Sequence, residues 1–231
     1  MKKYVFDVDG TLTPSRDKID IGFEQFMLEF ANKNKVYLVT GSDYPKTIEQ
    51  IGRNLAETVV KIYNCSGCDV WEKGKNIRKK SWTLPENAHH WLSEQLAESK
   101  FVLRTGLHFE HRPGMCNFSI VGRNATLGER KLYVAWDIQQ NERDIIAHNF
   151  NKLFTDIEAR PGGETGIDIA PKGWDKSQIL VDFDSSDEIY FFGDRMDEKG
   201  NDWPLANANK NGKNFHVKDW QDTWKLLENF I

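Results

Sequence analysis

The sequence predicts an α/β protein that carries an inserted α+β module, and three observations indicate this class. Apolar runs of strand length occur at 3–8, 36–40 and 188–194, with the nearly continuous hydrophobic pattern of buried parallel strands. Segments with the helical spacing of apolar residues separate them along the chain. Residues 80–171 instead have the pattern of short antiparallel strands beside helices.

The N-terminal elements are expected in the order strand, helix, strand, helix, strand. After the first strand, "FEQFMLEFANK" (23–33) has the apolar spacing of a helix. The strand at 36–40 precedes Ser42 and Asp43, residue types that favour a helix N-terminus, and "TVVKIYN" (58–64) has the composition of a strand. Because parallel strands need right-handed crossovers, this order predicts a parallel sheet.

The pattern changes in the middle of the chain. A basic strand is expected at 76–82, followed by a helix at 85–99. Two strands flank the turn at Pro113 and Gly114, and a further helix is expected at 142–157 before two more strands.

The α/β pattern then returns, with a helical segment at 176–183 before the apolar run, and a short strand at 214–220 before a C-terminal helix. The sequence therefore predicts a discontinuous core of residues 1–79 and 172–231, and a cap domain of residues 80–171.

Composition excludes several classes of protein. Hydrophobic residues make up 39% of the 231 residues, which argues against disorder. The formal net charge of −4 favours neither nucleic acid nor an anionic membrane as a partner. Asp7 and Asp9 interrupt the apolar stretch near the N-terminus, and no apolar window reaches the roughly 18 residues of a membrane span. The protein is therefore expected to be cytoplasmic.

The three cysteines are not expected to form a disulfide framework, because their number is odd and the protein is expected to be cytoplasmic. Cys65 and Cys68 form a C-x-x-C motif, which is compatible with a redox pair or half of a zinc site. A zinc site needs a second close pair of ligands, and His89 and His90 are adjacent, which is poor spacing on one helix. Reduced thiols near a strand end are the favoured interpretation.

Carboxylates and one lysine occur where an open α/β sheet binds its ligand. Asp7 and Asp9 end the first strand, Thr40 ends the second, and Asp194 ends the last apolar run, with Lys176 upstream of it. Ligands of such sheets bind at the carboxyl ends of the strands, so these side chains are expected to converge. Carboxylates that repel one another favour a hard cation, and Mg²⁺ prefers carboxylate oxygens, water and phosphate.

This set of residues suits phosphoryl transfer. One Asp can be the nucleophile that forms an aspartyl-phosphate, and the second can act as general acid and base. Mg²⁺ and Lys176 would neutralise the transferring group, and Thr40 would donate a hydrogen bond. The alternative is that D-V-D-G is only a strand-ending turn. The Thr-Gly-Ser at 40–42, Lys176 and "GDRMDEKGND" (193–202) together weigh against that alternative.

These motifs resemble those of the haloacid dehalogenase (HAD) superfamily. The four matching stretches are "FDVDGTLT", "LVTGS", "PKGWDKSQIL" and "FFGDRMDEKGND". The resemblance implies a HAD-like Rossmannoid core with an α+β cap of the C2B-like type. It also implies Asp7 as nucleophile, Asp9 as general acid and base, Thr40 and Lys176 as further catalytic residues, and a metal site of Asp7, Asp9, Asp194, Asn201 and Asp202.

The chain is more specifically similar to eukaryotic-type phosphomannomutases along nearly its whole length. "RPGMCNFSIVGR" (112–123) fits every fixed position of that family's R-x-G-M-x-N-x-S-x-x-G-R cap signature. The cap arginines of the family bind the phosphate that is not reacting. The resemblance also implies that this protein forms a homodimer through its cap. The resemblance therefore implies substrate binding by Arg16, Arg112, Asn117, Arg123, Arg130 and Asp168.

Two departures from the family pattern concern the sugar site. Gly166 replaces a serine in the G-G-x-x-S-x-D pattern, and Cys65-Ser66 stands where the family usually has Glu-Asn. In addition, Arg112 and Arg123 are eleven positions apart, so a fully extended strand would place them on opposite faces. Both arginines reach one ligand only if the turn at Pro113 and Gly114 redirects the chain.

Three functions are compatible with these residues. The first is a Mg²⁺-dependent phosphohexomutase that interconverts mannose 6-phosphate and mannose 1-phosphate, with a hexose 1,6-bisphosphate as activator. The second is a HAD-type sugar-phosphate phosphatase, in which water accepts the phosphoryl group. The third is a non-catalytic sugar-phosphate-binding protein, which the presence of all four motifs disfavours.

Overall fold

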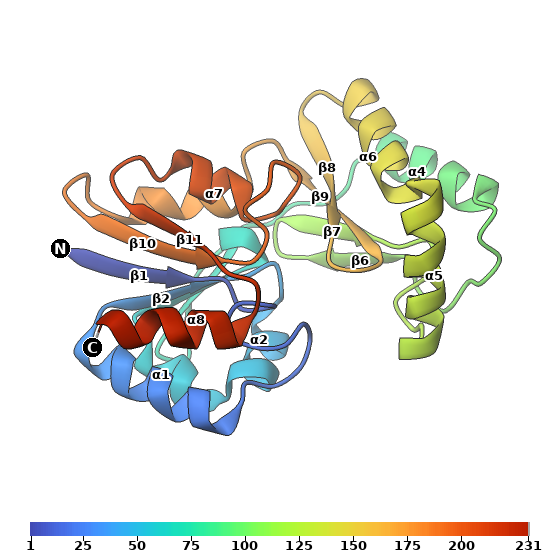
Figure 1. Cartoon of the computed structure of the whole chain (residues 1–231). Coiled ribbons are helices and arrows are strands. Elements are labelled where there is room, and N and C mark those ends of the chain that lie inside the picture. Colours follow the sequence, from blue (N-terminus) through green and yellow to red (C-terminus); the bar gives the residue numbers. More distant parts are fainter. Residues whose placement is uncertain (231) are drawn as a thin grey trace. The chain divides into compact units, whose positions relative to one another are not determined.

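The inserted segment forms a unit of its own in the computed structural model, which describes residues 1–230. One unit consists of Met1–Lys80 together with the chain from Gly173 onward, and the other is Ser81–Lys172. Figure 1 shows both units in sequence colours. We refer to the first as the core and to the second as the cap. Within residues 1–230, no helix combines the length and apolar character needed to span a bilayer.

The core is built on a seven-stranded sheet in the order β11-β10-β1-β2-β3-β4-β5. The first five strands of this order pair in parallel, whereas β4 and β5 continue the sheet antiparallel at one edge. The parallel strands are β1 (Lys2–Phe6), β2 (Val36–Val39), β3 (Lys61–Asn64), β10 (Glu188–Gly193) and β11 (Lys213–His216), and the edge pair is β4 (Asp69–Glu72) and β5 (Lys75–Lys79).

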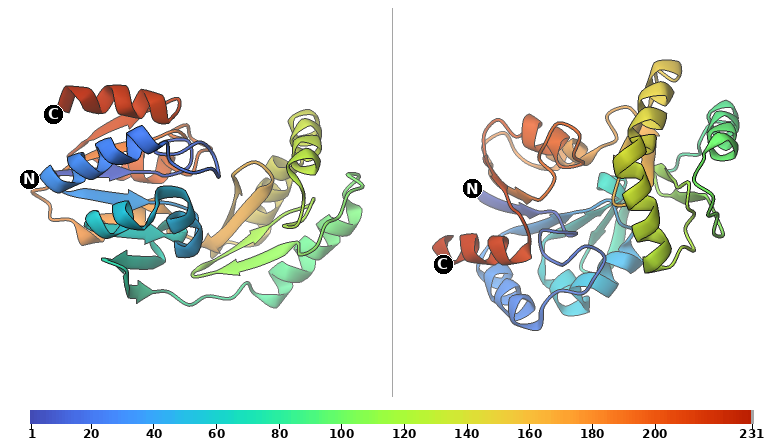
Figure 2. Two further views of the ribbon diagram at one scale, coloured as in Figure 1. Left: turned by 90° about the horizontal axis from the view of Figure 1, so that it is seen from below. Right: turned by 45° about the vertical axis from the view of Figure 1, so that its right-hand side comes forward.

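Both faces of the core sheet are covered, which explains the continuous apolar runs of its strands. Tyr4 and Phe6 pack on one face with residues of α1 (Ile21–Lys33), α3 (Arg53–Thr58) and α8 (Trp220–Leu227). Val5 faces the other way, toward the 3₁₀ helix η2 (Lys176–Asp182) and α7 (Trp203–Ala208). Figures 1 and 2 show α1 and α8 on one side of the sheet and α7 on the other.

The cap contains a four-stranded antiparallel sheet in the order β6-β7-β9-β8. Its strands are β6 (Phe109–Arg112), β7 (Met115–Phe118), β8 (Ile157–Gly162) and β9 (Gly166–Pro171), and its helices are α4 (Glu86–Glu98), α5 (Leu127–Gln140) and α6 (Glu142–Leu153). One apolar cluster joins one face of the sheet to these helices, and it includes Phe118, Ile167, Ala88, Tyr133 and Phe150. The predicted fold class, an α/β core with an inserted α+β cap, is confirmed.

Several elements differ from the sequence predictions. The expected strand at 76–82 is the shorter β5, and its partner β4 was not predicted. The segment at 176–183 is a 3₁₀ helix, and the expected helix at 142–157 ends at Leu153. Helix α5 was not predicted, although Thr126 and Glu129 form a capping box at its start. A further helix, α2 (Tyr44–Ile51), is capped by Asp43 as expected, and the Asp43 side chain accepts a hydrogen bond from the Lys46 backbone N–H at 3.0 Å.

Candidate active site

Three carboxylates meet at the carboxyl end of the core sheet. Asp7 follows β1 and Asp194 follows β10, two neighbouring parallel strands, and Asp202 lies just before α7. One carboxylate oxygen from each of the three lies within 4.8 Å of the other two. Asp7 and Asp202 are buried, whereas Asp194 is half-buried. The spacing would suit a single metal ion with oxygen ligands.

Two glycines allow the carboxylates to approach so closely. A Cβ added to Gly10 would lie 2.5 Å from Asp194 Oδ2, and Gly10 also has a φ of +77°. A Cβ added to Gly193 would lie 2.6 Å from Asp202 Oδ2. Both glycines therefore have a packing reason, and Gly10 has a conformational one as well.

Lys176 supplies the one positive charge in contact with this group in the part of the core that is described. It is the first residue of η2 and is completely buried. Its Nζ lies 2.6 Å from Asp7 Oδ1 and 2.7 Å from Asp202 Oδ1. Burial lowers the pKa of Lys176, but Asp202 and Asp7 more than reverse this effect, so the pKa is raised and the ammonium stays charged.

The carboxylates carry more negative charge than Lys176 can balance. Burial, together with repulsion from Asp202 and Asp194, raises the pKa of Asp7 well above its usual range despite the nearby ammonium. Burial and Asp202 likewise raise the pKa of Asp194. When all three carboxylates are ionised, the single ammonium leaves two negative charges uncompensated, which is why the pKa values of Asp7 and Asp194 are raised. A divalent cation is therefore the natural complement of this site.

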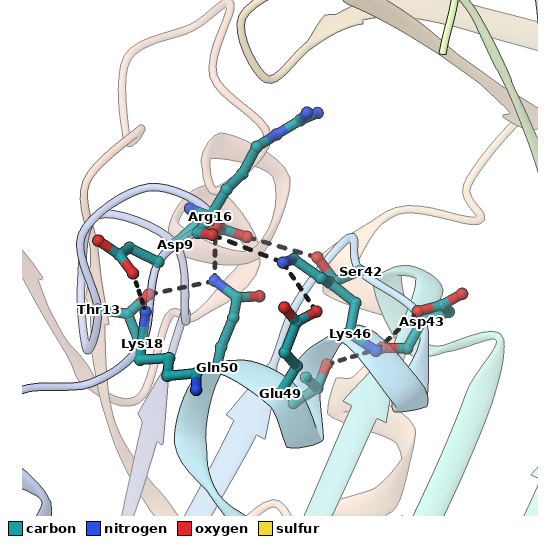
Figure 3. A network of polar contacts seen from close by, with 11 residues as sticks. Asp9, Thr13, Arg16, Lys18, Ser42, Asp43, Lys46, Glu49 and Gln50 are labelled. Carbon is teal, nitrogen blue, oxygen red and sulfur yellow. Dashed lines mark hydrogen bonds and ion pairs between the residues drawn. The ribbon is translucent and has the colours of Figure 1, made fainter. Parts of the chain in front are cut away.

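Asp9 lies outside this group of three and belongs to a separate polar network, shown in Figure 3. Its Oδ1 accepts hydrogen bonds from the Arg16 backbone N–H at 2.7 Å and from Gln50 Nε2 at 2.9 Å, and its Oδ2 accepts from Ser42 Oγ at 3.5 Å. Gln50 is buried and also donates to Thr13 Oγ1 at 3.2 Å. The side chain of Arg16 is exposed and extends away from Asp9.

The remaining predicted core residues lie near these two groups in the fold. Thr40 follows β2 and is buried, and its Oγ1 accepts from the Ser42 backbone N–H at 3.1 Å. Ser42 therefore links Thr40 to Asp9. Asn201 directly precedes Asp202 and is half-buried. The sequence reasoning missed Gln50 and Ser42 as partners of Asp9.

The C-x-x-C segment forms a tight loop after β3. Cys65, Ser66 and Gly67 have φ values of 48°, 57° and 95°, in the left-handed region. Cys65 and Cys68 are both buried, and burial raises the pKa of the Cys68 thiol. The Ser66 N–H donates to the Thr40 carbonyl at 2.8 Å, so the loop is tied to the end of β2. A buried thiol with a raised pKa favours the structural interpretation over redox chemistry.

In the cap, four predicted substrate-binding residues belong to one polar chain. Arg112 ends β6 and bonds Glu110 through Nη2 at 2.9 Å, while the Nε of Arg123 reaches the same carboxylate. Arg123 Nη1 donates to Asn117 Oδ1 at 3.1 Å, and Asn117 Nδ2 donates to Asp168 Oδ1 at 2.6 Å. The chain leaves the sheet after β7, so Arg123 returns to the side of Arg112 despite the eleven-residue spacing.

The strand register explains why these residues share a face. Glu110 pairs with Asn117, and Asn117 pairs with Asp168, so these side chains form a row across three strands. Their sequence neighbours, such as Phe118 and Ile167, point to the opposite face and pack against the helices. Arg130 lies apart on α5 and is buried, with its Nε 3.7 Å from Glu164 Oε2. Sequence reasoning did not identify Glu110 or Glu164.

Restoring the family serine at position 166 is expected to disturb this row. A Cβ added to Gly166 would overlap the amide of Asn117, which is itself buried and bonded to Asp168 and Arg123. We expect Gly166→Ser to cost about 1–3 kcal/mol of unfolding free energy, because overpacking displaces Asn117. Urea unfolding of Gly166→Ser, Asn117→Ala and the double variant checks this. The serine should cost less in the Asn117→Ala background, and strictly additive losses would contradict the account.

Comparison with known proteins identifies relatives of this chain. A model of the eukaryotic phosphomannomutase family matches residues 23–231. The phosphomannomutase of Saccharomyces cerevisiae is 31% identical over 239 residues, which covers 96% of this chain and 91% of that protein. The phosphomannomutase of Arabidopsis thaliana is 30% identical over 214 residues, which covers 89% and 87%.

Solved structures support the fold. A trehalose-6-phosphate phosphatase related protein has a TM-score of 0.59 at 15% identity, covering 99% of this chain and 96% of that one. A haloacid dehalogenase-like hydrolase from Bacteroides thetaiotaomicron has a TM-score of 0.59 at 13% identity, covering 100% and 99%. At these identities the likeness concerns the fold alone, and it confirms the predicted HAD-like architecture.

Proposed function

The chain belongs to the eukaryotic phosphomannomutase family, and from this we propose that it interconverts mannose 6-phosphate and mannose 1-phosphate through a phosphorylated Asp7. The observation that carries the proposal is the contact of the buried Asp7 carboxylate with Lys176, beside Asp194 and Asp202. Such a site can hold a phosphoryl group between a nucleophile and compensating positive charge. A family of isomerases that matches nearly the whole chain supports transfer to a sugar.

Each core residue has a role in this proposal. Asp7 attacks phosphorus and becomes an aspartyl-phosphate, and Lys176 balances the charge on both the carboxylate and the transferring group. Asp9 donates a proton to the leaving sugar oxygen and later removes one from the attacking hydroxyl. Gln50 and the Arg16 amide hold the Asp9 carboxylate in orientation. Thr40 donates a hydrogen bond to a phosphoryl oxygen.

The metal is proposed to be Mg²⁺. All donors in the acidic group are hard carboxylate oxygens, and their uncompensated charge fits a divalent ion. Asp7, Asp194 and Asp202 would hold it, with Asp9 and Asn201 as the further ligands implied by the family motifs. When bound, Mg²⁺ would polarise the phosphoryl oxygens and reduce the repulsion between phosphate and carboxylates.

The cap is proposed to bind the phosphate that is not reacting. Arg112, Arg123 and Arg130 would contact its oxygens, since guanidinium groups match phosphate geometry. Asn117 and Asp168 would bind sugar hydroxyls, and Arg16 would contact the substrate from the core. We also propose that residues 1–79 and 172–231 act as the catalytic domain, that residues 80–171 act as the cap, and that the protein is a cytoplasmic homodimer joined through its cap.

A sugar-phosphate phosphatase is the second candidate, and the departures at the sugar site favour it. Gly166 lacks a hydroxyl that the family pattern supplies, and Cys65-Ser66 replaces Glu-Asn. Fewer contacts to the sugar would allow water to compete for the phosphoryl group. The phosphoryl-transfer residues would be the same in both reactions.

Phosphorus NMR distinguishes the two candidates. The protein is incubated with mannose 1-phosphate, Mg²⁺ and a trace of hexose 1,6-bisphosphate, which is proposed to phosphorylate Asp7. We expect mannose 6-phosphate to accumulate without free phosphate. Free phosphate as the main product would exclude the mutase. Glucose 1-phosphate, assayed in the same way, measures the preference for the sugar.

A further inference from the structure

Glu110 is a side chain that links the two arginines of the cap signature. Arg112 donates to it through Nε at 3.2 Å and through Nη2 at 2.9 Å, so this pair is bidentate. The Nε of Arg123 contacts Oε2, the same oxygen that receives Arg112 Nη2. Two guanidinium groups from separate segments therefore converge on one carboxylate.

The far end of the Arg123 guanidinium is fixed as well. Its Nη1 donates to Asn117 Oδ1 at 3.1 Å, and Asn117 lies opposite Glu110 in the register of β6 and β7. The orientation of Arg123 is therefore set by contacts at both ends of its planar group. A planar donor group that is already oriented loses less entropy when it binds an anion.

Electrostatics gives Glu110 a second effect. The side chains of Arg112 and Arg123 are only 14% and 19% exposed, so water screens their mutual repulsion poorly. Burial raises the pKa of Glu110, but the hydrogen bonds and charges of Arg112 and Arg123 reverse this, and the net pKa is lowered. The carboxylate is therefore ionised at neutral pH and offsets the repulsion between the two guanidinium groups.

We propose that Glu110 is a positioning residue, which holds Arg112 and Arg123 side by side so that together they bind the non-reacting phosphate of the sugar substrate. The inference rests on the proposed function, because it assigns the anion to a phosphosugar. Glu110 acts through the arginines and takes no part in the chemistry at Asp7. Its loss should therefore weaken substrate binding more than it slows phosphoryl transfer.

The cap provides a matched control on the same sheet. Glu158 and Arg160 form an ion pair at 3.0 Å on β8, and Arg160 lies opposite Asp168 in the register. The exposed fractions of the carboxylates are similar, 28% for Glu158 and 33% for Glu110. Glu158→Gln removes the same charge from the same sheet without touching Arg112 or Arg123.

The test compares Glu110→Gln, Glu158→Gln and the unchanged protein. For mannose 1-phosphate we expect Glu110→Gln to raise KM by about 10–100-fold, because charge-assisted bonds orient both arginines. The rate of p-nitrophenyl phosphate hydrolysis should stay within about twofold, because the single phosphate of this substrate reacts with Asp7 and leaves none for the cap arginines to bind. Glu158→Gln should behave as the unchanged protein does. An unchanged KM in Glu110→Gln, or an equal rise in Glu158→Gln, would overturn the proposal.

A binding measurement separates this inference from the proposed function. Mannose 1-phosphate is titrated into protein from which a chelator has removed metal ions, so that binding is measured without turnover. The arginine ¹⁵Nε–H signals are followed by NMR. In Glu110→Gln we expect the Arg123 Nε–H signal to move upfield and the affinity to fall by about 10-fold or more. Equal affinity in both proteins would overturn the inference even if the unchanged enzyme is a mutase. If Glu110→Gln does not fold, Glu110→Asp replaces it, with an expected loss of about 3–10-fold.

Discussion

Replacing Asp7 by Asn is expected to reduce mutase turnover by at least about 10⁴-fold, because the amide has the shape of the carboxylate but cannot accept the phosphoryl group. Asn should still accept a hydrogen bond from Lys176, which lies 2.6 Å from Asp7 Oδ1. Binding of the sugar phosphate should therefore change much less than turnover. Steady-state kinetics together with a direct titration of mannose 1-phosphate measures both quantities.

The stability of Asp7→Asn provides an independent check. In the absence of metal, Asp7 is buried beside Asp194 and Asp202, and its pKa is raised by that burial and repulsion. Removing its charge should therefore leave the melting temperature unchanged or higher, as is common where a site is strained for function. Asp197→Asn is a suitable control, since Asp197 is exposed in the same motif. Turnover by Asp7→Asn within tenfold of the unchanged protein would exclude Asp7 as the nucleophile.

Replacing Lys176 by Met should have the largest effect on stability. Lys176 is completely buried and bridges Asp7 and Asp202, so its loss leaves two buried carboxylates without their counter-ion. Breaking a buried ion pair from one side typically costs about 3–5 kcal/mol. Turnover should fall by about 10²–10³-fold, because the transferring phosphoryl group also loses a compensating charge.

Urea unfolding with and without Mg²⁺ tests this explanation. In Lys176→Met, Mg²⁺ should increase the unfolding free energy more than it does in the unchanged protein, because the cation supplies part of the missing positive charge. Lys210→Met, which removes an exposed lysine of the core, should unfold normally. A Lys176→Met protein with unchanged unfolding free energy would show that the bridge does not stabilise the fold.

The site residues at the carboxyl ends of the strands were predictable, because the carboxyl ends of neighbouring parallel strands lie at the same edge of a sheet. Asp7 and Asp194 follow apolar runs, and parallel pairing of β1 with β10 brings those ends together. The presence of Asp202 in the cluster agrees with the motif around it, whereas the separation of Asp9 from the other carboxylates was not visible in the sequence. Asp9 instead accepts a hydrogen bond from Gln50, which is 41 residues away along the chain.

Glu110 and helix α5 were not predicted, although the sequence contains a pattern that indicates each of them. Glu110 stands two positions before Arg112, and residues at that spacing in a strand share a face. Thr126 caps helix α5, and the stretch Thr-Leu-Gly-Glu that starts there has the pattern of a capping box, although Gly128 in the first turn lowers the helix propensity. The convergence of Arg123 on Glu110 depends on the path of the chain after β7, which no local pattern specifies.

In the proposed reaction, a phosphoryl group on Asp7 is transferred to a sugar and not to water. The protein is loaded with labelled phosphoryl group from a hexose 1,6-bisphosphate, freed of excess donor, and mixed with mannose 6-phosphate or with buffer alone. If the protein is a mutase, we expect label to appear rapidly in a mannose bisphosphate when the sugar is present. In buffer alone, the protein should lose its label slowly, and the labelled peptide should contain Asp7. Label that is released as free phosphate at the same rate with and without the sugar would contradict it.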